Sequence, residues 1–247
     1  MKNIFYILLL ISQVFFAQTG FEKGNNLYQN GKYDLAAKAY ESVLNDNKES
    51  VELYFNLGNC YYKLHQTALA IYNYEKALVL DPSNPAVLNN IKFAQKQTID
   101  EIKVVPKVGF AKLLRDFTGI YPFETWAWIS ISFSMLVLVF FIGYYFSQNV
   151  VMKRVFFFGM FVILLLVVMS ISAAFFEKSH FDNEKPAIVF AESSDVRSEP
   201  QKAGSVIFVL HEGTKVYVEE TLGNWKKIQL TDGTEGWIDS GAIKEVK

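Results

Sequence analysis

Two long uncharged runs dominate the pattern of apolar and polar residues along this chain. No charged residue occurs between Glu124 and Lys153, and none between Arg154 and Glu177. A helix needs about 20 apolar residues to cross a hydrocarbon core of roughly 30 Å, and both runs are long enough. Neither run has a polar face, which argues against two buried helices of a soluble globule. We predict two transmembrane helices joined by a turn. The helices are residues 125–146 and 155–176, and the turn is residues 147–154.

The predicted hairpin puts the two ends of the chain on one side of the membrane. Backbone polar groups must be satisfied internally within lipid, so the turn lies outside the lipid on the other side. No ionisable side chain interrupts either helix, which argues against a transporter or a proton path. Small residues recur at four-residue steps, Ser130 with Ser134 and Ser170 with Ala174. We expect them to pack the two helices together, although a partner helix would use the same face.

The start of the chain, residues 1–17, has the pattern of a secretory signal. A basic start precedes an apolar run that is too short to span, with Ala17 at a plausible cleavage point. Phe15 stands where a small residue is usual, so an uncleaved anchor is the alternative. Export would leave Lys153 and Arg154 inside, in agreement with the positive-inside tendency. The basic residues before Trp126 conflict with it, but the tendency weakens for long translocated segments.

An internal repeat follows the signal. Sliding the sequence against itself matches Gly24, Ala36, Tyr40 and Leu44 to Gly58, Ala70, Tyr74 and Leu78. The small residues let paired helices approach, and the tyrosines fill the space beside them. Asn84 can cap a further helix that begins at Pro85. This pattern resembles the tetratricopeptide repeat and predicts an α-helical array, two repeats and a closing helix, over residues 18–97.

The resemblance implies a concave binding groove on the array. Carried onto this sequence, the family's pattern lines the groove with Phe21, Asn25, Tyr28, Phe55, Asn56, Asn59, Tyr62, Asn89, Asn90 and Phe93. An amide side chain can both donate to and accept from a peptide main chain, so the asparagines are candidates for holding a partner segment. The alternative is that they bond to neighbouring helices or to water. Phe21, Ala86 and Asn90 stand where such grooves carry basic residues, which argues against capture of a terminal carboxylate.

Residues 98–124 connect the array to the first span. A helix over residues 108–117 would align Phe110, Leu113, Leu114 and Phe117 on one stripe, which is typical of a segment lying at a lipid surface. Tyr121, Trp126 and Trp128 would mark the headgroup level just beyond it. Packing of this helix on the repeats is the alternative.

The pattern changes from helix to strand after a charged linker at residues 177–186. Short β-type segments are separated by turns at residues 211–213, 222–224 and 232–233, each of which contains glycine. Their order resembles the bacterial SH3-like domain, through Asp195-Val-Arg-Ser198, Gly223-Asn-Trp225 and Gly236-Trp-Ile238. The resemblance implies a small all-β barrel over residues 187–247. Such domains bind cell-wall peptides or protein segments, and the fold alone does not select between them.

Trp225 is the candidate surface residue of this domain. It lies three positions before Ile228, so in a regular strand the two side chains face opposite ways. Trp225 would then line a surface groove together with Tyr217. A bulge that buries both Trp225 and Ile228 is the alternative.

Composition and charge narrow the function classes. The 247 residues include 24 Lys and Arg against 25 Asp and Glu, which gives no electrostatic reason to expect nucleic-acid binding. His65, His180 and His211 have no spacing suited to a metal, and no nucleophile signature or phosphate loop is present. The single cysteine, Cys60, fits a small core residue. We predict no catalysis, no cofactor and no metal.

The order of signal, tetratricopeptide array, transmembrane hairpin and SH3-like tail resembles the E-type proteins of the Bacteroides aerotolerance operons. The resemblance implies a two-pass scaffold of the bacterial inner membrane with both soluble modules in the periplasm. Its partners would be von Willebrand A-type membrane proteins and, indirectly, a MoxR-type ATPase, in tolerance of oxidative or envelope stress. A competing hypothesis is an envelope sensor that binds peptidoglycan through its tail. A third, an enzyme, has no residue pattern to support it.

Overall fold

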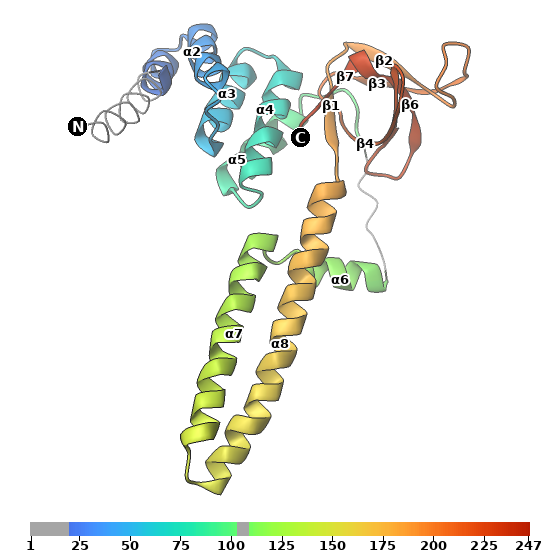
Figure 1. Ribbon diagram of the computed structural model, residues 1–247. Helices are drawn as coiled ribbons and strands as arrows, with labels where there is room; N and C mark the ends of the chain where they lie inside the picture. Colours follow the sequence, from blue (N-terminus) through green and yellow to red (C-terminus); the bar gives the residue numbers. More distant parts are fainter. Residues whose placement is uncertain (1–19, 103–108) are drawn as a thin grey trace, which may run out of the picture. The chain divides into compact units, whose positions relative to one another are not determined.

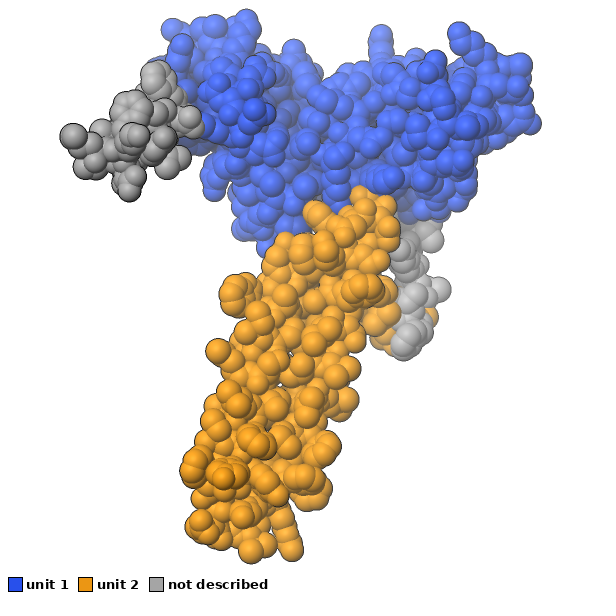
Figure 2. All heavy atoms as spheres, in the orientation of Figure 1, with its two compact units in different colours: residues 1–105, 185–247 blue, residues 106–184 orange. Residues whose placement is uncertain are grey.

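The computed structural model describes residues 20–102 and 109–247, which form two compact units (Figure 2). Unit 1 comprises Met1–Val105 and Lys185–Lys247, and unit 2 comprises Pro106–Glu184. The chain therefore leaves unit 1 after the helical repeats, forms unit 2, and returns to unit 1. The predicted signal sequence, residues 1–17, lies outside the described residues.

Unit 1 begins with the predicted helical array (Figure 1). The Ser50 side chain caps a helix by accepting a hydrogen bond from the Leu53 N–H at 3.1 Å. Asn84 caps the closing helix as predicted, accepting from the Val87 N–H at 3.3 Å. The array of two helix pairs and a closing helix is confirmed. Its helices are residues 20–29, α2 Tyr33–Asn45, α3 Val51–Lys63, α4 Thr67–Leu80 and α5 Pro85–Gln95.

In each repeat a glycine of one helix packs directly against a tyrosine ring of the next helix. A Cβ atom added at Gly24 would lie 2.4 Å from the ring of Tyr40, and one at Gly58 would lie 2.7 Å from the ring of Tyr74. Both rings are 1% exposed. The close approach that the repeat pattern predicted is present in both copies. Cys60 is fully buried in the same core, and burial raises the pKa of its thiol to about 12.

The rest of unit 1 is a seven-stranded antiparallel sheet. Valine and isoleucine side chains fill one face, with Val196, Ile228 and Ile238 fully buried. The strand order is β3-β2-β6-β5-β4-β1-β7. The elements are β1 Pro186–Val189, β2 Ser193–Arg197, β3 Val206–His211, β4 Lys215–Leu222, β5 Trp225–Gln229, β6 Glu235–Asp239, the 3-10 helix η1 Ser240–Ala242 and β7 Ile243–Glu245.

The sheet is open, whereas the sequence led us to expect a small barrel. Strands β3 and β7 form its two edges and do not pair with each other. The chain after β7 continues beside β1, where the Val246 N–H donates to the Pro186 carbonyl at 2.8 Å, and the Val246 side chain is buried in the core of the helical repeats.

The helices and the sheet of unit 1 share part of their core. Ile188 and Val246 are fully buried among the residues of the helical repeats, and Phe190 packs beside them. The rings of Tyr72 and Phe190 meet edge to face, with their centroids 5.7 Å apart. Glu75, whose side chain is 7% exposed, pairs with Lys215 at 2.8 Å.

Asp100, which follows the closing helix, holds the sheet by hydrogen bonds. Its carboxylate accepts from the His211 backbone N–H at 2.7 Å and from the Thr214 hydroxyl at 2.6 Å, and His211 Nδ1 lies 2.8 Å away. Burial alone would raise the pKa of the Asp100 carboxyl, but the hydrogen bonds from Thr214 and His211 outweigh it and hold the pKa below its ordinary value. The two parts of unit 1 are thus joined by packing and by partly buried polar contacts.

Unit 2 contains α6 Phe110–Thr118, α7 Phe123–Phe146 and α8 Val150–Asn183 (Figure 1). By length and composition α7 and α8 could each cross a membrane. At 1.5 Å per residue their 24 and 34 residues extend about 36 and 51 Å, against a hydrocarbon core of roughly 30 Å.

Helix α8 is longer than the predicted second span. It begins at Val150, within the expected turn, and continues through most of the expected linker to Asn183. The Asn149 side chain caps its start by accepting from the Val151 N–H at 2.8 Å. Side-chain contacts one helical turn apart support its end: the ion pair of Lys178 with Asp182 at 3.1 Å, and His180 Nε2 at 2.9 Å from the Glu184 carboxylate.

Helix α6 is attached to the ends of the other two helices. Glu177 of α8 accepts from Arg115 Nη1 at 3.1 Å and from the Thr118 hydroxyl at 2.6 Å. Trp126 Nε1 of α7 donates to the Thr118 carbonyl at 2.8 Å. Leu113 remains 67% exposed.

Candidate functional site

The predicted groove residues lie on the first helix, on α3 and on α5. Most of them are half-buried, so they are neither core nor free surface. Phe93 is 48% exposed, and Asn89 is exposed as well. The half-buried members are Phe21, Asn25, Tyr28, Phe55, Asn56, Asn59, Tyr62 and Asn90.

Asn25 connects three helices through its side-chain carbonyl. Its Oδ1 accepts from the Tyr40 hydroxyl at 2.6 Å and from Asn56 Nδ2 at 3.2 Å. Tyr40 belongs to α2 and Asn56 to α3. Burial raises the pKa of Tyr40 to about 12, so its hydroxyl keeps its proton and remains a donor at neutral pH.

The same network recurs in the second repeat. Asn59 Oδ1 accepts from the Tyr74 hydroxyl at 2.7 Å and from Asn90 Nδ2 at 2.8 Å. Asn25 and Asn59 thus have the same role in successive repeats. We name these four asparagines, Asn25, Asn56, Asn59 and Asn90, the asparagine row.

The asparagine row therefore bonds to neighbouring helices, which is one of the two alternatives that the sequence left open. Sequence reasoning treated Tyr40 and Tyr74 as packing residues and missed their hydroxyls as donors, although their equivalence in the two repeats was visible. An amide has two donors and two acceptor lone pairs, so each amide keeps capacity beyond the bonds described. Binding of a partner main chain by this row stays a prediction.

Aromatic rings flank the asparagine row at matching positions. The centroids of Phe21 and Tyr40 lie 5.6 Å apart, and those of Phe55 and Tyr74 lie 6.1 Å apart. Phe21 and Phe55 occupy equivalent positions of the two repeats. The face on which the row lies is thus a repeated surface of amides and half-buried aromatic rings.

In the sheet, the register separates the two predicted surface residues. Tyr217 lies opposite Gln229, and Trp225 lies opposite Leu222, at the other end of the β4–β5 ladder. Four residues along a strand correspond to roughly 13 Å, so Tyr217 and Trp225 are not side by side. The register follows from the turn at residues 223–224, which fixes the pairing from that end.

Trp225 itself is half-buried, while Ile228 is fully buried. The β5–β6 register is regular, so these two side chains face opposite ways, and the bulge of this hairpin lies in β4, between Val218 and Glu220. The alternative in which a bulge buries both Trp225 and Ile228 is not what the structure shows.

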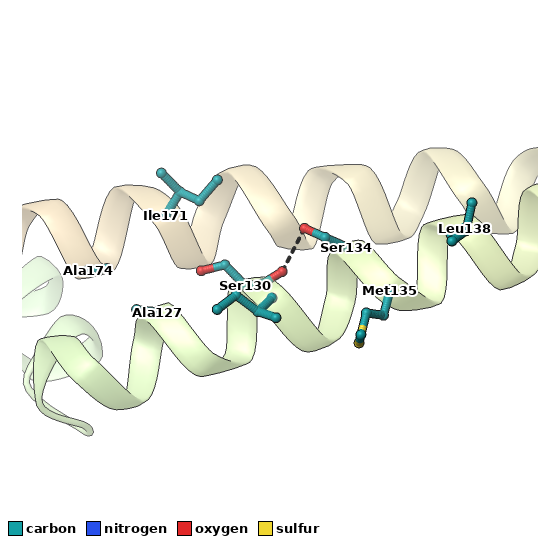
Figure 3. A pocket seen from close by; sticks show the side chains of 8 residues that line it. Ala127, Ser130, Ser134, Met135, Leu138, Ile171 and Ala174 are labelled. Carbon is teal, nitrogen blue, oxygen red and sulfur yellow. Dashed lines mark hydrogen bonds between the residues drawn. The ribbon is translucent and has the colours of Figure 1, made fainter. Parts of the chain in front are cut away.

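A groove of about 620 Å³ runs along the hairpin of unit 2 (Figure 3). Ser130, Ser134 and Ala174, three of the predicted small residues, are among its lining. Ser130 and Ser170 are 7% and 2% exposed, so small residues do pack the two helices together. The Ser134 hydroxyl donates to the Ser130 carbonyl at 2.7 Å, within its own helix.

Two glycines that the sequence analysis did not single out also bring α7 and α8 together. A Cβ atom at Gly143 would lie 2.8 Å from the ring of Phe156, and one at Gly159 would lie 2.4 Å from the ring of Phe140. Each glycine thus receives an aromatic ring from the other helix. The sequence signal that could have predicted these contacts was one glycine within the apolar run of each helix.

Within residues 20–102 and 109–247, no group of three or more His, Cys, Asp or Glu side chains could hold a metal ion. His211 and His180 instead lie beside the carboxylates of Asp100 and Glu184.

Comparison with known families identifies the two parts of unit 1. A family model described as "Tetratricopeptide repeat" matches residues 21–85, and one described as "Bacterial SH3 domain" matches residues 192–244. The helical array is therefore a tetratricopeptide repeat domain, and the open sheet is a bacterial SH3 domain. Both resemblances drawn from the sequence are confirmed at this level.

Proposed function

We propose that this protein is a non-catalytic membrane scaffold that binds protein partners through its tetratricopeptide repeat domain. The observation that carries this is the repeated face of the asparagine row, which presents amides and half-buried rings to solvent. Such a surface can hydrogen-bond a main chain and cover apolar side chains at once. A partner segment lying across the first helix, α3 and α5 would contact both copies of the network.

We propose further that α7 and α8 span a membrane, with the two domains of unit 1 in the periplasm. Large apolar residues stay exposed along both helices; Phe141 and Phe158, for example, are 50% and 65% exposed, as lipid-facing residues would be. Leu113 and Phe117 of α6 are also exposed, which suits a helix held at the lipid surface by the Glu177 contacts.

The resemblance to the E-type aerotolerance proteins leads us to name the partners. They are von Willebrand A-type membrane proteins and, indirectly, a MoxR-type ATPase, in a complex that serves tolerance of oxidative or envelope stress at the bacterial inner membrane. The order of domains along the chain supports this proposal.

A pull-down with exposed groove variants tests the scaffold. We expect Phe93→Ser, on the predicted binding face of α5, to reduce recovery of von Willebrand A-type proteins from detergent extracts, measured by quantitative mass spectrometry. Leu88→Ser is the matched control, because Leu88 is also exposed on α5 but points away from that face. Equal recovery with both variants would remove the groove from the proposal.

Labelling with a membrane-impermeant maleimide tests the topology. Cys60 is fully buried, so introduced cysteines report alone. We expect Lys202→Cys in the SH3 domain to be labelled in spheroplasts and Gln148→Cys in the turn to be labelled only after lysis. The reverse pattern would put both domains in the cytoplasm and exclude the partners named above.

The second candidate is an envelope sensor that binds peptidoglycan through the SH3 domain. The match to the bacterial SH3 family and the half-buried Trp225 on the outer face of β5 favour it. Co-sedimentation of the full-length protein with purified peptidoglycan, lost in Trp225→Ala and kept in Val209→Ala, would support the sensor. An absence of co-sedimentation would reject it.

A further inference from the structure

The side of helix α3 that is turned away from the asparagine row is buried, with Tyr54, Leu57 and Tyr61 5%, 2% and 7% exposed. At 3.6 residues per turn, Tyr54, Leu57 and Tyr61 fall on one face of the helix. Asn56 and Asn59 fall on roughly the opposite face. The first repeat, which follows the repeat pattern less closely, has Gly20 and Leu27 at the positions of Tyr54 and Tyr61.

The face formed by Tyr54, Leu57 and Tyr61 lines a groove of about 480 Å³. Helix α2 contributes Glu41, and α4 contributes Tyr72, Asn73 and Lys76. Strand β7 of the SH3 domain contributes Lys244. The groove is thus formed jointly by the two domains of unit 1, and we name it the composite groove.

One wall of the composite groove carries two ammonium groups near the ring of Tyr72. Lys244 Nζ lies 4.4 Å from the Tyr72 centroid, and Lys76 Nζ lies 6.0 Å from it. Lys244 Nζ is also 5.8 Å from the centroid of Phe190. Within the described part of the chain neither lysine forms an ion pair, so ring contacts hold both charges near the groove.

The carboxylates near the composite groove are already engaged by tyrosine hydroxyls. Tyr61 donates a hydrogen bond to Glu41. Burial raises the pKa of Tyr54, and a hydrogen bond to Glu49 adds to this shift. A neutral hydroxyl leaves the carboxylate charge in place, so Glu41 keeps a negative charge on the α2 wall of the groove. The wall that would accept an anionic group is the one formed by Lys76 and Lys244 beside Tyr72.

We propose that the composite groove binds an extended acidic peptide segment of a protein partner. A carboxylate of the segment would lie between Lys76 and Lys244, and its apolar part would cover the half-buried ring of Tyr72. The volume suits a segment of a few residues. This site lies on the side of α3 away from the asparagine row, so it stands or fails independently of the function proposed for that row.

A random dodecapeptide library displayed on phage, panned on the full-length protein in lipid nanodiscs, tests this site. We expect the recovered peptides to be enriched in Asp and Glu next to apolar residues. The double variant Lys76→Gln/Lys244→Gln should reduce recovery of these peptides by about tenfold, since both complementary charges are removed. Lys38→Gln/Lys92→Gln is the matched control, because these lysines are exposed on α2 and α5 outside the groove.

The control variant should recover the acidic peptides as the wild type does, and so should Phe93→Ser on the asparagine-row face. Circular dichroism confirms that each variant is folded. Peptides without acidic enrichment, or equal recovery by the Lys76→Gln/Lys244→Gln variant, would overturn the proposal. A salt-sensitive self-association of the wild type that this variant abolishes would overturn it too, because a second copy of the chain would then occupy the groove.

Discussion

The two faces of helix α3 differ in how they relate to the repeat. On one face, Asn59 bonds to Tyr74 and Asn90, and the same bonds recur in the first repeat around Asn25. On the other face, Tyr54 and Tyr61 line the composite groove, and the first repeat has Gly20 and Leu27, which carry no hydroxyl, at these positions.

The difference distinguishes contacts that recur with the repeat from residues that occur only once in this chain. A polar network that recurs with the repeat joins each helix pair to the next, because every repeat faces the same packing problem. Tyr54 and Tyr61 are buried in the core of the helical repeats, so they pack there as well as line the composite groove. The composite groove differs from the asparagine row in adding residues from outside the repeat pattern, above all Lys244 of the SH3 domain.

The largest effect on stability is expected from a substitution that breaks the packing of α3 on α4. Gly58→Leu would push a side chain into the Tyr74 ring, which lies 2.7 Å from the position of a Cβ atom. We expect a loss of about 3 kcal/mol or more in the free energy of unfolding. Urea unfolding of the full-length protein in detergent, followed by near-ultraviolet circular dichroism, measures it.

Gly31→Ala is the control for that variant. Gly31 has a positive φ of 73° but no atom within 4 Å of an added Cβ. Backbone strain alone should cost about 1 kcal/mol there. An equal loss at both positions would show that close approach to Tyr74 is not what Gly58 provides.

Asn59→Leu breaks the asparagine-row face alone. The variant leaves the hydroxyl of Tyr74, a residue that is 1% exposed, and the amide of Asn90 without their shared acceptor. We expect the free energy of unfolding to fall by about 2 kcal/mol. The exposed neighbour Asn89, changed to Leu, should alter it by less than about 0.5 kcal/mol. A small effect at Asn59 would deny the network its structural role.

Asp100→Asn tests the composite groove indirectly. The substitution weakens the hydrogen bonds that hold the SH3 domain, which supplies Lys244, to the segment after α5. We expect a loss of about 1.5 kcal/mol at pH 7, since charge-assisted hydrogen bonds from His211 and Thr214 are weakened. Urea unfolding of wild type and variant measures this difference.

The pH dependence of that difference has a definite sign. The folded-state pKa of Asp100 is lowered, so its contribution is fully present above the unfolded pKa of about 3.9 and is lost as the pH falls through the folded pKa. The gap between wild type and Asp100→Asn should therefore shrink below about pH 4. A gap that stays constant down to pH 3 would argue against an ionised Asp100.

The smallest effect is expected for Tyr61→Phe on the face of the composite groove. The change removes one hydrogen bond to Glu41, a half-buried carboxylate that water can reach, and keeps the ring. We expect a loss of about 0.5 kcal/mol in the free energy of unfolding. A loss as large as that of Asn59→Leu would mean that the two faces of α3 contribute equally to stability.

Several elements could be predicted because their signals are local in sequence. Asn84 and Pro85 start α5 where the sequence placed its start. The two charge-free runs give α7 and most of α8. The helical end of α8 could have been found as well, because Lys178 and Asp182 are one helical turn apart.

The site was harder to predict because its partners are distant in sequence. The repeat spacing showed that Asn25 and Asn59 are equivalent but not that each accepts from a tyrosine of the following helix. The register of β4 and β5 decided that Tyr217 and Trp225 lie apart. Lys244 reaches the composite groove only because the SH3 domain packs on α4.

The sequence by itself determined the repeat, the two apolar helices and the strands of the tail, because hydrophobic period, caps and turns act over a few residues. The tertiary structure decided which side chains meet: the bonds of the asparagine row, the open edges of the sheet and the wall that β7 adds to the composite groove. Burial of Ile188 and Val246 among the helices fixes that arrangement. No local sequence pattern predicts this arrangement, because the residues that meet are separated in sequence by the whole of unit 2.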